Sequence, residues 1–128
     1  MQDNAKIIDS WLDGSEKDFE IAKRLFKSKD YSYALFFCHL SLEKLLKALI
    51  IKKKNELPPP IHLLVRLANL SGIKFSKEQL DDLAEITAFN IKARYDDYKL
   101  KFYKKATRSY TAKYFKKVAE LRDFMKGL

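Results

Sequence analysis

Three residues that could do acid–base or ligand chemistry recur at intervals of four in the segment YALFFCHLSLEKLLKALI, residues 33–50. They are His39, Glu43 and Lys47, and in a helix this spacing places the three side chains in one stripe. The rest of the segment is apolar on most of its circumference, which predicts a central, buried helix. A buried carboxylate needs a partner to offset its lost hydration. We predict that the stripe fixes the register of packed helices and supports a nearby site.

The partner predicted for Glu43 is Arg94, because a guanidinium at the end of a later helix can bind a carboxylate through two hydrogen bonds. A stripe that also contacts a ligand is the alternative. Ser41 is two residues from His39, and positions two apart on a helix point in different directions, so a Ser–His pair is not expected. His62 follows three prolines at a helix start, where we expect it to cap or pack.

Other motifs for catalysis or cofactor binding are absent from the sequence. Two His and one Cys, without H-x-x-x-H or C-x-x-C spacing, predict no metal site. The three glycines, at positions 14, 72 and 127, cannot form a phosphate-binding loop, and no G-x-S-x-G motif is present. We therefore expect no cofactor. The lone Cys38 cannot form a disulfide within the chain, and we expect it to be a small buried hydrophobic residue.

The formal net charge of +9 lies almost entirely in the last third of the 128 residues. Residues 1–90 hold 14 Lys and Arg against 13 Asp and Glu, whereas residues 91–128 hold 12 against 4. This asymmetry indicates an acidic partner, namely nucleic acid, nucleotide phosphates or an acidic protein surface, and a solvated face that serves solubility is the alternative. The predicted phosphate-binding cations are Arg94, Lys99, Lys101, Lys104, Lys105 and Arg108. Tyr95, Tyr98, Phe102 and Tyr103 are interleaved with them and are predicted to stack on bases.

Apolar residues that recur three or four positions apart predict an all-α fold. The predicted helices cover about residues 4–28, 31–54, 77–94 and 107–126, with a shorter one in HLLVRLANL that ends near residues 71–72. Residues 95–106 are highly charged with a poor helical pattern, and we predict an irregular loop there. The sequence therefore predicts a single domain over residues 1–128, an up-and-down helical bundle of four to five helices.

Local signals set the predicted helix ends and buried faces. Asp30 is a predicted N-cap of the second helix, three prolines at 58–60 end that region, and Ser76 with Gln79 forms a capping-box pattern. The predicted inward face of the fourth helix consists of Leu80, Leu83, Ala84, Thr87, Ala88 and Ile91. The predicted inward face of the last helix consists of Tyr110, Tyr114, Val118, Leu121 and Met125.

The sequence contains no pattern typical of a membrane-spanning helix or of a signal peptide. No run of about 20 apolar residues could span a bilayer. The first residues are acidic and amphipathic, without the apolar core of a signal peptide. We therefore expect a cytoplasmic protein without membrane contact.

Four segments together resemble the HEPN family, the higher eukaryotes and prokaryotes nucleotide-binding domains. The segment YSYALFFCHLSLEKLLKALI resembles the second-helix signature of the family, and WLDGSEKDFEIAKRLF resembles its opening segment. The segment IHLLVRL is similar to the His-Leu-x-x-Leu third element, and ARYDDY to the Arg-Tyr motif after the fourth helix. Their order covers nearly the whole chain. The resemblance implies a small bundle, often a homodimer, commonly encoded beside a minimal nucleotidyltransferase.

Many HEPN proteins cleave RNA without a metal through an Arg-(x)4–6-His motif, and this sequence departs from that motif. Counted from Arg94, the histidine should stand at 99, 100 or 101, where the chain has Lys, Leu and Lys. Lysine is a poor proton shuttle near pH 7. The resemblance therefore implies a non-catalytic nucleotide- or RNA-binding module, the partner of a minimal nucleotidyltransferase in a toxin–antitoxin-like pair. One alternative is an RNase toxin with a degenerate site, and another is a structural dimerisation or adaptor bundle that binds an acidic protein.

Overall fold

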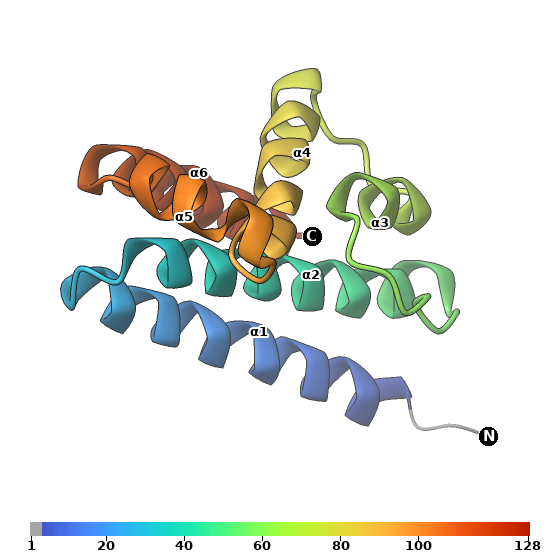
Figure 1. The fold of residues 1–128 in the computed structure, drawn as a ribbon. Coiled ribbons are helices and arrows are strands. Elements are labelled where there is room, and N and C mark those ends of the chain that lie inside the picture. The colour runs from blue at the N-terminus through green and yellow to red at the C-terminus, as the bar shows by residue number, and fades with distance from the viewer. Residues whose placement is uncertain (1–3) are drawn as a thin grey trace.

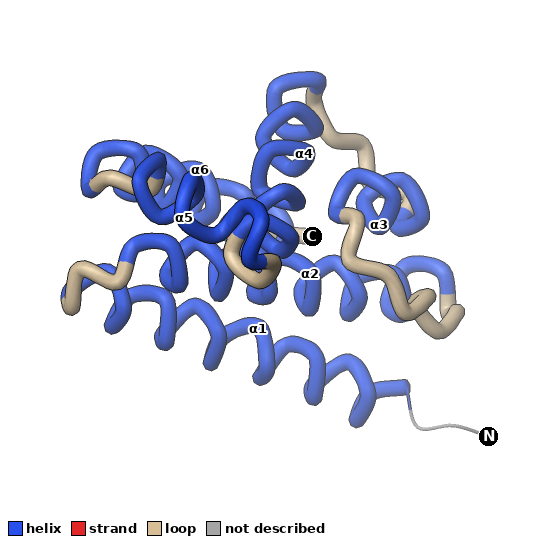
Figure 2. Tube along the Cα trace, in the orientation of Figure 1, coloured by secondary structure: helices blue, strands red, loops and turns tan. Residues whose placement is uncertain are grey.

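The protein is described by a computed structural model, which covers residues 4–128 apart from the side chains of residues 96 and 97. Its six helices are α1 (Asn4–Lys27), α2 (Tyr31–Lys54), α3 (Leu64–Ser71), α4 (Lys77–Lys92), α5 (Asp96–Lys105) and α6 (Arg108–Lys126). The described residues contain no strand (Figure 2), which confirms the predicted all-α bundle. None of the helices in residues 4–128 combines the length and apolarity needed to cross a membrane.

The central helix is α2, against which all the other helices pack. Of its 24 residues 15 are buried, so no long face of the helix is left to solvent. Figure 1 shows α1 running antiparallel along one side of α2, with α4, α5 and α6 on the other side and α3 near the end of α2. This arrangement follows from the sequence pattern, since a helix that is apolar on most of its circumference must be covered from several directions.

The predicted helix ends are largely confirmed. The helix α2 ends at Asn55, whose left-handed backbone (φ 54°) lets its amide bond the Ile51 carbonyl. Gly72 ends α3 with a φ of 75°, a conformation that favours glycine. The capping box at the start of α4 has both of its hydrogen bonds, between Ser76 and Gln79. Asp30 stands at the N-cap position of α2, but its side chain makes no capping hydrogen bond.

The buried face of α4 is rotated by part of a turn from the predicted face, so that prediction was wrong in part. Leu83 is buried as predicted, but Ala84 and Ile91 are exposed. The buried positions are instead rotated toward Phe89, whose ring lies 5.5 Å from the ring of Phe102 in α5. An aromatic ring removes more apolar surface from water than alanine does, so Phe89 decides which face turns inward. The predicted inward face of α6 is confirmed, with Tyr110 only half-buried at its start.

The segment predicted as an irregular loop contains the helix α5. Phe102 is the one buried residue among the described side chains of this helix, and the following Ala106 is buried at its C-cap. A single buried residue among the described side chains of α5 gives no apolar stripe, which is why periodicity could not reveal the helix. The helix α5 packs against α4 and α2, and in Figure 1 it lies on the side of α2 opposite α1.

A buried arginine joins α1, α2 and α6. The hydroxyls of Ser15 and Ser41 each donate to the other residue's backbone carbonyl, at 2.7 and 2.9 Å, which holds α1 close against α2. Arg122 of α6 is 3% exposed and donates through Nη1 to both hydroxyls, at 2.7 and 2.6 Å. Its Nη2 pairs with Glu16, and its guanidinium lies 4.7 Å from the centre of the Phe19 ring. Polar groups that would be costly to bury alone therefore satisfy one another.

We expect Arg122→Ala to lower the free energy of unfolding by about 2–4 kcal/mol, because it removes charge-assisted hydrogen bonds and packing against Phe19. The measurement is urea denaturation followed by circular dichroism. Arg66→Ala, which removes an exposed arginine of α3, is the matched control and should change the free energy by less than about 0.5 kcal/mol. Equal effects of the two substitutions would contradict the role assigned to Arg122.

Candidate functional site

The polar stripe of α2 is buried and joins three parts of the chain. Glu43 is 5% exposed and accepts a hydrogen bond from Lys47 Nζ at 2.9 Å. The other carboxylate oxygen accepts from His62 Nδ1, also at 2.9 Å, so the loop before α3 is held against α2. The Lys47 ammonium lies 5.3 Å from the centre of the Trp11 ring of α1. The stripe therefore acts as a clamp between α1, α2 and the loop.

The predicted partner of Glu43, Arg94, lies elsewhere. The helix α4 ends at Lys92, which leaves Arg94 exposed in the turn before α5, where its Nη1 donates to Asn90 at 3.2 Å. The proline-rich loop delivers His62 to Glu43 instead. The sequence pattern places His62 at a helix start but does not predict this contact. The signal available was chemical: a buried carboxylate needs a donor, and the sequence holds only two histidines.

His39 is fully buried and has no access to a ligand. Its Nε2 donates to the His62 carbonyl at 3.0 Å, and its Nδ1 has no hydrogen-bond partner among the described residues. Burial lowers the pKa of His39, although the bond to the His62 carbonyl and the Glu43 carboxylate, 3.8 Å away, both oppose this shift. The imidazole is held neutral in a structural role.

The structure also shows whether the cysteine is reactive and whether metal-ligating side chains gather. Cys38 is fully buried as predicted, and burial raises the pKa of its thiol, so it is not held as a reactive thiolate. Among the described residues no three His, Cys, Asp or Glu side chains come together in a group that could hold a metal ion.

The predicted cationic and aromatic residues fall into two groups. Tyr95, Tyr98 and Tyr103 are 57%, 51% and 67% exposed, so the core does not use their rings. The exposed cations beside them are Arg94, Lys99, Lys101 and Lys104. Phe102 belongs to the core and cannot stack on a ligand base. We call these four cations and three tyrosines the α5 surface.

Lys105 and Arg108 make packing contacts within the protein. Lys105 Nζ lies 3.4 Å from Glu85 of α4 and 5.3 Å from the centre of the Tyr110 ring. The Tyr110 hydroxyl donates to the same carboxylate at 2.7 Å, and this bond lowers the pKa of Glu85. The Arg108 guanidinium lies over the Phe26 ring, at 5.6 Å. These two predicted cations therefore anchor α5 and the start of α6.

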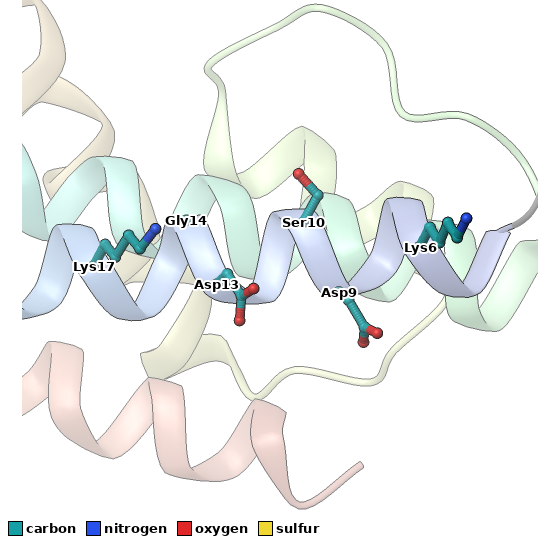
Figure 3. Close-up of a pocket in the computed structure, with 6 residues that line it drawn as sticks. All are labelled: Lys6, Asp9, Ser10, Asp13, Gly14 and Lys17. Atoms are coloured by element: carbon teal, nitrogen blue, oxygen red, sulfur yellow. The ribbon is translucent and has the colours of Figure 1, made fainter.

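A hollow of about 440 Å³ on α1 shares no lining residue with the α5 surface, and Figure 3 shows the residues that line it. Its six lining residues all belong to α1 and include both lysines and aspartates. Figure 3 shows Asp9 and Asp13 on one side of the helix and Ser10 on the other. Side chains spread along a single helix do not converge on one point, so this hollow offers no site for chemistry.

The chain matches a known protein family. A family model described as HEPN domain matches residues 8–128, nearly the whole chain. Searches of curated proteins and of solved structures give no match. The resemblance inferred from the four sequence segments is thus confirmed.

We expect Glu43→Ala to lower the free energy of unfolding by about 3–5 kcal/mol, because it leaves the Lys47 ammonium buried without its carboxylate. Urea denaturation measures the change. Glu56→Ala, in the exposed loop after α2, is the control and should have little effect. A small effect of Glu43→Ala would show that the stripe is solvated in solution.

The lowered pKa of His39 predicts a loss of stability in acid. In the unfolded chain an imidazole titrates near its reference pKa of about 6.5. Because the pKa of His39 is lower in the folded protein, the unfolded state binds more protons than the folded state as the pH falls below that value. The free energy of unfolding should therefore decrease as the pH falls from about 7.5 to 5. We expect a smaller decrease for His39→Gln, whose amide retains a donor for the His62 carbonyl. Denaturation curves at several pH values test this, and parallel pH profiles for the two proteins would contradict it.

Proposed function

Because the chain belongs to the HEPN domain family, we propose that it is a module that binds nucleotides or RNA through the α5 surface. The observation that carries the proposal is the exposure of three tyrosine rings among cations on one short helix and the turn before it. A folded chain gains stability by burying such rings. Their exposure beside positive charge is what binding of single-stranded nucleic acid requires, since bases stack on aromatic rings and phosphates neutralise lysines.

The charges of the α5 surface are available to a ligand. Lys99, Lys101 and Lys104 are exposed, and no ion pair with them is found among the side chains that the structure describes. Lys101 and Lys104 are three positions apart on the helix and so share a face. Lys99 and Tyr103, four apart, line a groove of about 300 Å³ between α5 and the start of α2. The lysines and tyrosines of the α5 surface are therefore interleaved. A single strand could place its phosphates on the lysines and its bases on the tyrosine rings.

Binding without catalysis is favoured by the placement of the acid–base groups. Positions 99–101, where the cleavage motif of the family has its histidine, hold Lys, Leu and Lys on α5. His39 is buried, and His62 directs its Nδ1 to Glu43. Neither histidine belongs to the α5 surface. We therefore propose a binding module in preference to an RNase.

The partner of the module is proposed from the family resemblance alone. We propose that the chain acts in the cytoplasm as a homodimer beside a minimal nucleotidyltransferase, in a toxin–antitoxin-like pair. The α5 surface would then present a nucleotide or RNA to the partner.

A titration of fluorescein-labelled single-stranded RNA, followed by fluorescence anisotropy at several salt concentrations, tests the proposed function. We expect affinity to fall steeply as salt rises. In Lys99→Ala/Lys101→Ala the log–log salt slope should become shallower by about 1.4, because each phosphate contact to a single strand contributes about 0.7. Lys17→Ala/Lys52→Ala removes the same charge from other exposed positions and should bind like the wild type.

The same samples, run on a denaturing gel, separate the other functions. Cleavage of the RNA that disappears in Arg94→Ala would contradict the binding module and favour an RNase. Neither binding nor cleavage would also contradict it, and would favour an adaptor bundle that meets an acidic protein. Equal losses in the two double variants would show that net charge alone, and not the α5 surface, attracts RNA.

A further inference from the structure

Two grooves adjoin each other where α5 passes the start of α2, and each has a volume of about 300 Å³. The first, which we call the lysine groove, is lined by Lys29, Tyr31 and Lys104 among others. The second, the tyrosine groove, is lined by Tyr33, Ala93, Lys99 and Leu100 among others. Ser32 and Tyr103 line both grooves, so the two form one continuous depression.

Small buried residues form the floor of this depression. Ser32 is 8% exposed, Ala106 in the lysine groove 4%, and Ala93 in the tyrosine groove 6%. The walls are the large exposed side chains of α5 and the start of α2, above all Tyr103. A small floor between tall walls gives a depression that a flat or compact ligand can enter.

The Ser32 side chain is the polar group of the floor, and it is unpartnered. More than nine-tenths of Ser32 is buried, its hydroxyl oxygen is open to the groove, and no hydrogen bond joins that hydroxyl to a described residue. An unpaired hydroxyl on the floor of a groove can be reached by a ligand that enters the groove and can donate to it.

The start of α2 adds further donors at the same place. The bond from the Ala34 amide to the Asp30 carbonyl is the first of the helix, so the amides of residues 31–33 precede the bonded ladder. Asp30 stands at the N-cap without a side-chain capping bond. These free amides form the positive end of the helix dipole, which favours a bound anion.

The charge of the lysine groove matches an anion. Lys29 and Lys104 line it from opposite elements, the turn before α2 and the end of α5. No acidic residue lines either groove among those whose side chains are described. The tyrosine groove is more apolar, with Leu100 and Ala93 beside the Tyr33 and Tyr103 rings. One groove thus suits a phosphate group and its neighbour suits a base.

We infer that Ser32 and the free amides of α2 form a phosphate subsite, with the base of the same nucleotide beside Tyr103 in the tyrosine groove. The inference rests on the proposed function and gives the nucleotide a defined position and polarity. The phosphate is held by the Ser32 hydroxyl, the helix start and the two lysines. It belongs to a free nucleotide, to the end of an RNA strand or to an internal position of the strand, which the experiment distinguishes.

The first test is competition of AMP and adenosine against the labelled RNA at constant ionic strength. We expect AMP to compete at least tenfold better than adenosine with the wild-type protein. In Ser32→Ala this advantage should fall by about tenfold, because one hydrogen bond to a charged group is lost. Ser10→Ala, which removes an exposed serine hydroxyl of α1, is the control and should keep the wild-type preference.

The second test is Ser32→Asp, which places a negative charge on the floor of the depression. Binding of AMP and of RNA should be lost because the carboxylate repels the phosphate, while the helical circular dichroism signal should stay that of the wild type, because the positive end of the helix dipole offsets part of the cost of burying the charge. Loss of binding together with a loss of helical signal would point to local unfolding and would overturn this part of the inference.

The outcomes separate this inference from the proposed function. If the wild-type protein binds no RNA, both fail. If it binds RNA through Lys99 and Lys101 but AMP and adenosine compete equally, or Ser32→Ala matches the control, only the phosphate subsite fails. With the subsite present, tighter binding of RNA carrying a 5′-phosphate than of RNA with a 5′-hydroxyl assigns it to a strand end. Equal binding of the two, both weakened by Ser32→Ala, assigns it to an internal phosphate. RNA binding that Ser32→Ala leaves unchanged, with the preference for AMP reduced, assigns it to a free nucleotide.

Discussion

The burial of α2 on nearly every side is the constraint on which the structure depends. A helix without a solvent face must bring its polar side chains into contact with partners from other elements, because an unpaired charge or hydroxyl in the core is costly. Ser41 forms hydrogen bonds with Ser15 and Arg122, and Glu43 pairs with Lys47 and His62. Each pairing joins a different helix or loop to α2. The packing order of the bundle is thus set by the polar interruptions of an apolar helix as well as by the apolar surface itself.

The two polar joints differ in kind. The joint around Arg122 lies between three helices and brings two backbones close through small serine side chains. The joint around Glu43 ties down a loop, since the prolines that end the α2 region leave a segment with no ladder of its own hydrogen bonds. Together they leave α5 as the helix with the fewest buried side chains among those described. The buried contacts are concentrated around α2, and the exposed rings and cations lie on α5 and the turn before it.

Sequence patterns predicted the features that depend on local order. The long helices, the capping box of Ser76 and Gln79, and the inward face of α6 follow from spacing and from side-chain chemistry within a few residues. The errors share a different cause. The helix α5, the inward face of α4 and the partner of Glu43 depend on contacts between residues far apart in the chain, as in the packing of Phe89 on Phe102 and of His62 on Glu43. Periodicity within one segment carries no information about those contacts.

The candidate site likewise has features that the sequence predicted and features that depend on contacts between distant residues. The positions of the exposed tyrosines and lysines were visible in the sequence as composition, but the roles of Lys105 and Arg108 were not. Their contacts with Glu85 and the Phe26 ring come from elements more than 15 positions away. Ser32 was not predicted at all, because a serine in the first turn of a helix is ordinary until the fold shows that no described residue bonds to its hydroxyl.

The attachment of α5 through Phe102 has a consequence for how such a chain can diverge. A substitution at an exposed position of α5 alters what the helix presents without touching the contact that holds it in place. Mutational drift can therefore exchange a tyrosine for another ring, or a lysine for a neutral side chain, while the bundle keeps its architecture. Descendants of one ancestral sequence could acquire different ligand preferences on an unchanged scaffold, and the phenylalanine at this position would be the residue that selection holds fixed.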